Sequence, residues 1–142
     1  MYPGFESKVR ESFARQQFMT TIRAELVRVA AGEVDIQLPY DPRLTQQHGF
    51  LHAGVVTAAV DSACGYAALT LLDADADVLT VELKVNLLEP ATAQRLLARG
   101  RVLRPGRTLT VCRGDAVAVN DETETIVATL LTTMMRVRGG GY

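Results

Sequence analysis

The sequence predicts a single α+β domain in which a curved antiparallel sheet wraps around one long helix. Three observations predict this class. Residues 55–72 carry a single charged side chain and are otherwise mostly apolar, as in a helix covered on nearly every face. Most segments after residue 79 alternate apolar with other residues, the two-residue period of strands. With 142 residues, 48 % of them apolar, the chain is sized for one domain with its own core.

The N-terminal half predicts a helix, a strand pair and a loop. Apolar residues spaced by four predict an amphipathic helix over residues 5–17. Alternating patterns predict strands over 22–27 and 33–38, joined by a turn at 30–32. Residues 39–48 contain two prolines and are expected to form a loop.

The long helix is expected to start near Gly54 and to end before an acidic turn at residues 73–77. Gly114 is a candidate β-bulge, and residues 139–142 are expected to form a flexible tail of the single domain 1–142. Four strands are predicted after the acidic turn, over residues 80–87, 94–103, 109–120 and 125–137. One sheet covers one side of a helix well, so we expect a second copy to cover more, in a homodimer or homotetramer.

Composition disfavours several classes of partner. The chain has 15 basic and 16 acidic residues, for a net charge of -1, which gives no reason to expect nucleic acid. Residues 55–72 reach only the lower length limit of a membrane span, and their central acid favours a buried helix, without a membrane partner. Cys64 and Cys112 form no motif and suggest a reducing, cytoplasmic location. Two histidines and two unlinked cysteines predict no metal site.

The acid in the apolar helix is Asp61. The positions three and four residues away hold no basic side chain; they are Thr57, Ala58, Cys64 and Gly65. Burying a neutral polar group without a hydrogen bond costs about 2–7 kcal/mol, and burying an isolated carboxylate costs more. A buried carboxylate is therefore usually neutralised or finds partners. Two interpretations therefore stay open: Asp61 binds backbone groups of another segment, or it has a function.

The residues just before this helix favour a function. His52 lies at the mouth of the helix, and Ala53 and Gly54 are small enough for a ligand to approach the backbone. The first amides of a helix are unpaired donors at its positive end and suit an oxygen that gains negative charge. A base within the helix and amides at its start can together serve acyl transfer.

In these residues the chain resembles the hotdog-fold acyl-CoA thioesterases of the phenylacetate-pathway (PaaI-like, or thioesterase superfamily member 2) type. That family carries an Asn, a Gly, then His-Gly-Gly, and an Asp nine positions after the His. Here residues 46–54 read QQHGFLHAG, and Asp61 lies nine positions after His52. Gln46 stands where the family has Asn, and Ala53 where it has Gly. The resemblance covers nearly the whole chain and implies a hotdog fold.

The resemblance also implies roles for individual residues. Asp61 corresponds to the carboxylate that activates water or attacks the thioester directly. The amide of Ala53, next to Gly54 of the motif, corresponds to the donor that polarises the thioester carbonyl. His52 corresponds to the motif histidine, which orients the loop or the thioester; a hydrogen-bonded loop histidine is the alternative.

Two further site residues come from the same resemblance. Gln46 keeps an amide that can hold the water or the carbonyl, although its side chain is one methylene longer than Asn. Thr80 corresponds to a residue that the neighbouring subunit contributes to the active site in this family. An ordinary strand threonine is the alternative for Thr80.

A coenzyme A substrate needs partners for its phosphates. The turn around Arg104 and Arg107 is basic and suits phosphate oxygens, with Arg136 and Arg138 as possible additions; a solvated basic hairpin is the alternative. No cofactor is expected beyond the coenzyme A of the substrate itself. Non-catalytic acyl-CoA binding is the alternative function, and a hydratase or dehydratase ranks low because no His–acid motif of that kind is visible.

Overall fold

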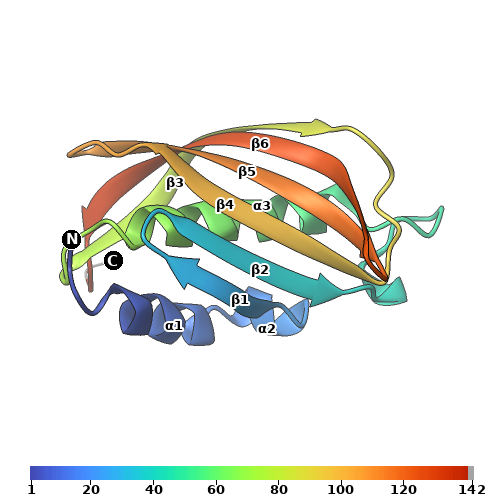
Figure 1. Ribbon diagram of the computed structural model, residues 1–142, viewed down its shortest axis with the longest axis horizontal. Coiled ribbons are helices and arrows are strands. Elements are labelled where there is room, and N and C mark those ends of the chain that lie inside the picture. The colour runs from blue at the N-terminus through green and yellow to red at the C-terminus, as the bar shows by residue number, and fades with distance from the viewer. Residues whose placement is uncertain (141–142) are drawn as a thin grey trace.

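The computed structural model describes residues 1–140 and has six strands, three α-helices and one 3₁₀ turn. The strands form one antiparallel sheet in the order β1-β2-β4-β5-β6-β3, which wraps around α3 (Figure 1). This confirms the predicted architecture. The elements are α1 Phe5–Arg15, α2 Gln17–Thr21, β1 Glu25–Ala30, β2 Glu33–Pro39, the 3₁₀ turn Pro42–Leu44, α3 Ala53–Leu69, β3 Ala76–Leu87, β4 Arg95–Arg104, β5 Leu109–Asn120 and β6 Thr123–Arg138.

The N-terminal segment differs from the sequence prediction. The helix expected over residues 5–17 breaks at Gln16, whose backbone is extended (φ -79°, ψ 95°), and continues as α2. The strand expected from residue 22 begins at Glu25 instead, because Ile22 caps α2 and Arg23 adopts a positive φ of 59°. The buried residue Ile22 therefore belongs to the end of α2 and not to a strand.

Other boundaries move by a few residues. β3 begins at Ala76, so part of the expected acidic turn is already strand. The bulge predicted at Gly114 is wrong: Gly114 pairs regularly with Gly100. The irregularity in the pairing of β5 with β6 lies between Ala116 and Val117, and that in its pairing with β4 lies between Val102 and Arg104. Gly139 donates its amide hydrogen to the carbonyl of Asp75 at 2.7 Å. Residues 141–142 of the predicted tail lie outside the described residues.

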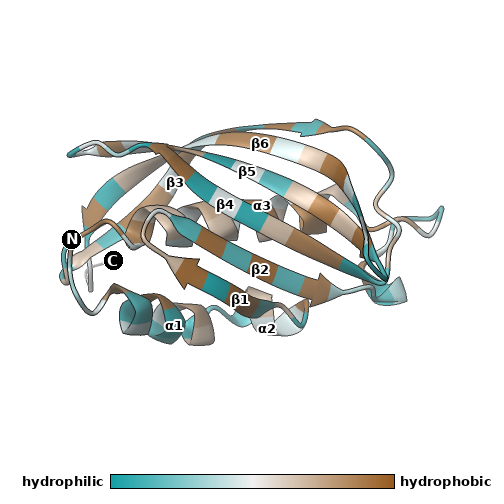
Figure 2. Ribbon diagram, viewed as in Figure 1, coloured by the Kyte–Doolittle hydropathy of each residue, from teal (hydrophilic) through white to brown (hydrophobic). Residues whose placement is uncertain are grey.

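The paired glycines explain how closely α3 approaches the sheet. A Cβ on Gly100 would lie 2.3 Å from the carbonyl carbon of Ala63, and one on Gly114 would lie 2.4 Å from Cγ1 of Val60. Small residues on α3, such as Ala59, complete this contact and are fully buried. Figure 2 shows brown and teal alternating along β4 and β5, the pattern of strands with one face on the core.

The sheet leaves one stripe of α3 partly uncovered. Along that stripe Thr57, Ala58, Asp61, Ser62 and Gly65 are only half-buried, whereas most of the remaining helix is buried. The acid that the sequence singles out therefore sits on the one face of α3 that its own sheet does not close. In residues 1–140, no helix is both long and apolar enough to cross a membrane.

Candidate active site

The N-terminus of α3 is capped by its motif histidine. His52 occupies the N-cap, and its Nδ1 accepts a hydrogen bond from the amide of Gly54 at 2.8 Å. A Cβ on Gly54 would lie 3.0 Å from that nitrogen, so a residue without a side chain suits the close contact. Val55 and Val56 both donate to the carbonyl of His52. This contact is that of the hydrogen-bonded loop histidine given as the alternative, and it is also compatible with a role in orienting the loop.

These bonds leave one amide of the first turn available. The N–H of Ala53 has no hydrogen-bond partner among residues 1–140. It lies at the positive end of a helix of 17 residues, where an unpaired amide stabilises an oxygen that acquires negative charge. Ala53 also borders a cavity, so the donor that the sequence predicts is beside open space.

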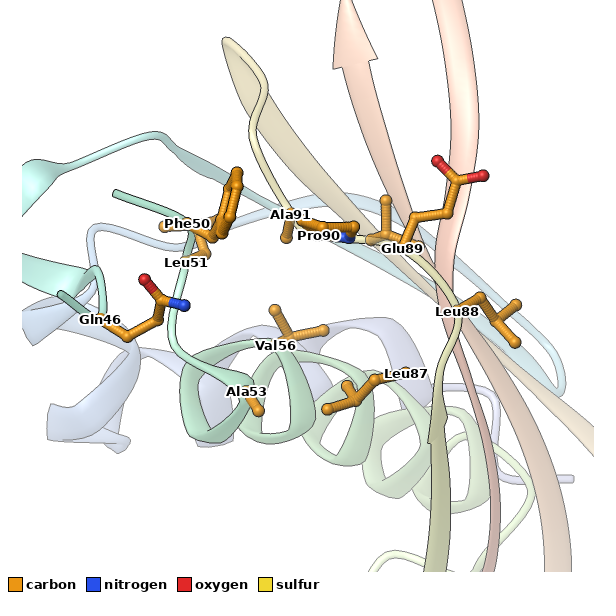
Figure 3. A pocket seen from close by; sticks show the side chains of 11 residues that line it. Gln46, Phe50, Leu51, Ala53, Val56, Leu87, Leu88, Glu89, Pro90 and Ala91 are labelled. Carbon is orange, nitrogen blue, oxygen red and sulfur yellow. The ribbon is translucent and has the colours of Figure 1, made fainter. Parts of the chain in front are cut away.

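This first cavity has a volume of about 450 Å³ and is mostly apolar. Gln46 reaches toward it from the loop before α3 (Figure 3). The Gln46 Oε1 accepts a hydrogen bond from the amide of His48 at 2.5 Å, which leaves the side-chain amide hydrogens for a ligand. The other lining residues are Phe50, Leu51, Val56, Leu87, Leu88, Glu89, Pro90, Ala91 and Val127.

Asp61 lies on a second cavity, further along α3. Thr80 on β3 donates its hydroxyl hydrogen to Oδ1 of Asp61 at 2.9 Å. Burial raises the pKa of Asp61, and the hydrogen bond from Thr80 partly lowers it again. Among the described residues no basic side chain forms an ion pair with Asp61. A half-buried carboxylate without a cation is a chemically competent proton acceptor.

The structure separates the predicted catalytic residues into two groups within one chain. Asp61 and Thr80 line the second cavity, whereas Gln46 and Ala53 line the first. Asp61 follows Ala53 by eight residues on the same helix, a rise of about 12 Å at 1.5 Å per residue. One thioester group cannot contact both positions of a single chain.

Thr80 contacts Asp61 within one chain. The resemblance implies that this threonine reaches the active site from the neighbouring subunit. β3 pairs with β6 at the edge of the sheet and contacts α3, and there the Thr80 hydroxyl bonds to Asp61 of its own chain. Thr80 and Asp61 therefore belong together, and a contribution of Thr80 to a partner's site would include Asp61 as well.

The predicted phosphate contacts are partly brought together. Arg107, Arg136 and Arg138 line one shallow cavity of about 310 Å³, together with Asp75. Arg136 also forms an ion pair with Asp73 at 2.7 Å. Arg104 is exposed at the end of β4 and does not line this cavity. In residues 1–140, no group of three His, Cys, Asp or Glu side chains could hold a metal ion.

Sequence reasoning missed the polar residues that face Asp61 from the N-terminal segment and from α3. Ser12, Gln16 and Tyr66 line the Asp61 cavity. A signal was present in the sequence: Gln16 follows Val9 and Phe13 at a spacing of seven and three residues, on the apolar face of the helix. A polar residue on an apolar face is informative because it needs a buried partner.

Comparison with known proteins identifies the family of this chain. The model of the thioesterase superfamily matches residues 48–125, more than half of the chain. A crystal structure of a thioesterase family protein from Silicibacter pomeroyi is 51 % identical, with a TM-score of 0.94, over 96 % of this chain and 100 % of that one. The protein named "Putative esterase SSO2140" from Saccharolobus solfataricus is 35 % identical over 72 % of this chain and 74 % of its own.

A more distant structure shows the same fold. The PaaI protein of the E. coli phenylacetic acid degradation operon superposes with a TM-score of 0.84 at 17 % identity, over 96 % of this chain and 94 % of that one. The hotdog fold that the sequence predicts is thereby confirmed. Together with the match of the family model, these comparisons establish that the chain belongs to the thioesterase superfamily and is a thioester hydrolase with the hotdog fold.

Proposed function

We propose that this protein hydrolyses acyl-coenzyme A thioesters, with Asp61 as the general base or the nucleophile. The observation that carries this proposal is the environment of Asp61: half-buried, without a cation, and open to a cavity. As a base, the carboxylate takes a proton from water while the water oxygen bonds to the thioester carbon. The carbon–sulfur bond then breaks, and the proton passes to the departing sulfur, which gives a carboxylic acid and coenzyme A.

The carbonyl oxygen in this mechanism is stabilised at the start of α3. The unpaired amide of Ala53 and the side-chain amide of Gln46 both face the first cavity. Two donors aimed at one oxygen stabilise the tetrahedral intermediate; removal of one such donor in other enzymes costs about 10²–10³-fold in rate. Gly54 contributes indirectly, because its amide holds the capping imidazole of His52.

A complete site requires two copies of the chain. The separation of about 12 Å between Ala53 and Asp61 along α3 prevents one chain from supplying both. A homodimer with the uncovered stripes of two antiparallel α3 helices face to face brings Asp61 of one protomer toward Ala53 of its partner. The exposed edge of β3 supports this arrangement, since Leu79, Val81 and Leu83 are 44, 50 and 40 % exposed there. Pairs of such dimers would give the homotetramer.

The nucleotide end of coenzyme A is assigned to the basic side chains around the turn between β4 and β5. Arg107, Arg136 and Arg138 supply guanidinium groups around one cavity, and such groups bind phosphate oxygens in a bidentate manner. Arg104 lies on the same hairpin, close enough along the chain to extend this surface. The cytoplasmic location remains a prediction.

The proposal is tested with a panel of acyl-coenzyme A thioesters whose hydrolysis is followed by the release of free thiol. We expect turnover by the native protein and a loss of about 10²–10⁴-fold in kcat for Asp61→Asn, the range for removal of a general base. Glu122→Gln is the matched control, since it removes an exposed carboxylate in the turn between β5 and β6 that lines neither cavity. Tight binding without turnover by the native protein would contradict hydrolysis and support the acyl-CoA-binding alternative.

A further inference from the structure

The cavity beside Asp61 has features that the hydrolysis of a thioester does not by itself require. It has a volume of about 240 Å³ and lies between α1, α3 and β3. Its apolar side is formed by Leu69, Val78, Leu79 and Met134, and its polar side by Ser12, Gln16, Ser62 and Tyr66. The reacting carboxylate thus opens onto a small chamber with one apolar and one polar wall.

Charge indicates which part of the substrate enters this chamber. Two carboxylates, Asp61 and Asp77, line it, and no arginine or lysine of residues 1–140 does. The phosphates of coenzyme A would be repelled there, whereas the arginines at the β4–β5 turn attract them. Besides its oxygen, the thioester carbon carries the sulfur of coenzyme A and the acyl chain. Since the coenzyme side bears the phosphates, the chamber is assigned to the acyl chain.

The polar wall is held by a residue from the break between the two N-terminal helices. Gln16 donates from Nε2 to Oγ of Ser62 at 3.2 Å, and its Oε1 accepts the hydroxyl hydrogen of Tyr66 at 3.0 Å. Tyr66 is fixed from the other side by Phe13, whose ring centroid lies 5.7 Å away. The extended backbone of Gln16 directs its side chain toward α3 instead of along the helix axis.

These bonds leave hydrogen-bonding capacity on the polar side of the chamber. The Gln16 amide has a second N–H, and the Tyr66 oxygen has lone pairs besides the hydrogen that it donates. Ser62 accepts from Gln16, and its own hydroxyl hydrogen donates to no group among residues 1–140. An apolar acyl group placed here would leave these polar groups without water or partners, which is unfavourable.

The floor of the chamber is a glycine. Gly65 lies one helical turn beyond Asp61, and a Cβ there would meet Cε of Met134 at 3.8 Å and Cγ2 of Val78 at 4.0 Å. These are ordinary contact distances, so the fold does not require glycine at this position. Its absence of a side chain instead enlarges the chamber next to the reacting carboxylate.

We propose that Gln16 and Gly65 are specificity-determining residues: Gln16 selects acyl groups that carry a hydroxyl or oxo group at their far end, and Gly65 sets the size that is accepted. This inference rests on the proposed thioester hydrolysis and deepens it to a substrate class. The N-terminal segment thereby forms part of the acyl pocket and does more than cover the sheet edge.

The test compares matched pairs of substrates. The butanoyl, pentanoyl and hexanoyl thioesters of coenzyme A are each paired with the corresponding ω-hydroxyacyl thioester, and kcat/KM is measured for native protein, Gln16→Leu and Gln17→Leu. The native protein is expected to favour the best hydroxylated substrate by about tenfold, the value of one net hydrogen bond. Gln16→Leu should abolish or reverse this preference. Gln17→Leu is the control, because Gln17 is exposed and lies outside the chamber.

Gly65→Ala tests the size of the chamber in the same experiment. The added methyl group should lower kcat/KM for hexanoyl relative to acetyl thioester by about tenfold, the effect of one methylene-sized mismatch in a pocket, with an unchanged melting temperature. Hydrolysis by the native protein with equal selectivity in Gln16→Leu and Gly65→Ala would overturn this inference alone. No hydrolysis of any thioester by the native protein would overturn both this inference and the proposed function.

Discussion

Asp61, the carboxylate proposed to act in catalysis, is expected to oppose stability. Burial raises its pKa above the ordinary value of aspartate, so the folded protein holds this group less readily as an anion than the unfolded chain does. The stability contribution of such a group is present at low pH, and it is lost as the pH rises through the folded-state pKa. At neutral pH the charged carboxylate therefore destabilises the fold.

Asp61→Asn is consequently expected to raise the melting temperature by a few degrees at pH 7 while it removes activity. The amide keeps an acceptor for the Thr80 hydroxyl but carries no charge to desolvate. Thermal unfolding of both proteins at pH 7 and at pH 4 measures the effect, and the gain should shrink at the lower pH, where native Asp61 is more protonated. A melting temperature lowered at neutral pH would show that Asp61 is a structural residue.

Thr80 tunes the same carboxylate. Its hydrogen bond stabilises the anion and lowers the pKa of Asp61 against the effect of burial. Thr80→Val removes this bond, so the pKa of Asp61 should rise further and the acidic limb of the kcat/KM profile should move to higher pH. Thr80→Ser keeps the hydroxyl and should keep the native profile. A uniform loss of rate without a shift of the limb would contradict this role.

Arg107 allows the coenzyme site to be tested apart from catalysis. It lines the basic cavity and is exposed, so its attraction for phosphate should weaken with salt. Arg107→Ala should raise KM for a coenzyme A thioester several-fold at low salt and leave kcat within about twofold, the pattern for loss of uniform binding. An N-acetylcysteamine thioester, which lacks the nucleotide, is the control substrate. Equal effects on both substrates would exclude a phosphate contact.

At the scale of the elements, the packing of α3 on the sheet depends on glycines in β4 and β5. A Cβ on Gly100 would come within 2.5 Å of three backbone atoms of α3, which cannot move independently of the helix. The helix would have to shift away from the sheet, and Asp61 and the first turn would move with it. The close approach therefore stabilises the core and also sets the geometry of the site.

Gly100→Ala is expected to lower the free energy of unfolding by about 1–3 kcal/mol or more, the range for overpacking in a core. Gly65→Ala on α3 is the matched control, because its added methyl group would meet only side-chain atoms at ordinary contact distance. Urea unfolding followed by circular dichroism measures both variants. Similar stabilities of the two variants would mean that α3 can shift without cost.

The sequence predicts the elements well where one pattern dominates. The alternation in β5 and the apolar run of α3 indicate their places to within about three residues. The prediction fails at the break at Gln16, because the spacing of the apolar residues before it gives no sign of a break, whereas hydrogen bonds of Gln16 with Ser62 and Tyr66 act across about 50 positions of the chain. The bulge was misplaced for a similar reason: Gly114 is required by contact with α3 and not by the course of its own strand.

The candidate site shows the same division. Spacing alone finds Asp61 and the start of α3, because both lie on one continuous helix. It cannot show that Thr80 of the same chain bonds to Asp61, since that contact depends on where β3 pairs with β6. Nor can it show that Ala53 and Asp61 open onto different cavities. Only the three-dimensional arrangement shows that one chain places these two residues on separate cavities.

At the scale of the whole molecule, the two edges of the sheet differ. The outer edge of the β1 side lies beside α1 and α2, whereas β3 at the other end carries exposed apolar side chains and no covering helix (Figure 1). An exposed edge of this kind pairs readily with another strand. If two copies pair through β3, their α3 helices are brought together and the two half-sites are completed.

Val81→Glu should therefore convert the assembly to monomers and remove activity. Val81 lies in the bulge between Thr80 and Glu82, opposite no residue of β6, so a charge there should leave the monomer folded. Val27→Glu is a close control: Val27 also lies in a bulge, on β1, and is 51 % exposed against 50 % for Val81. Analytical ultracentrifugation and the thiol-release assay are run on the same samples. A fully active Val81→Glu monomer would show that one chain holds a complete site, and a Val81→Glu dimer would show that copies associate through another face.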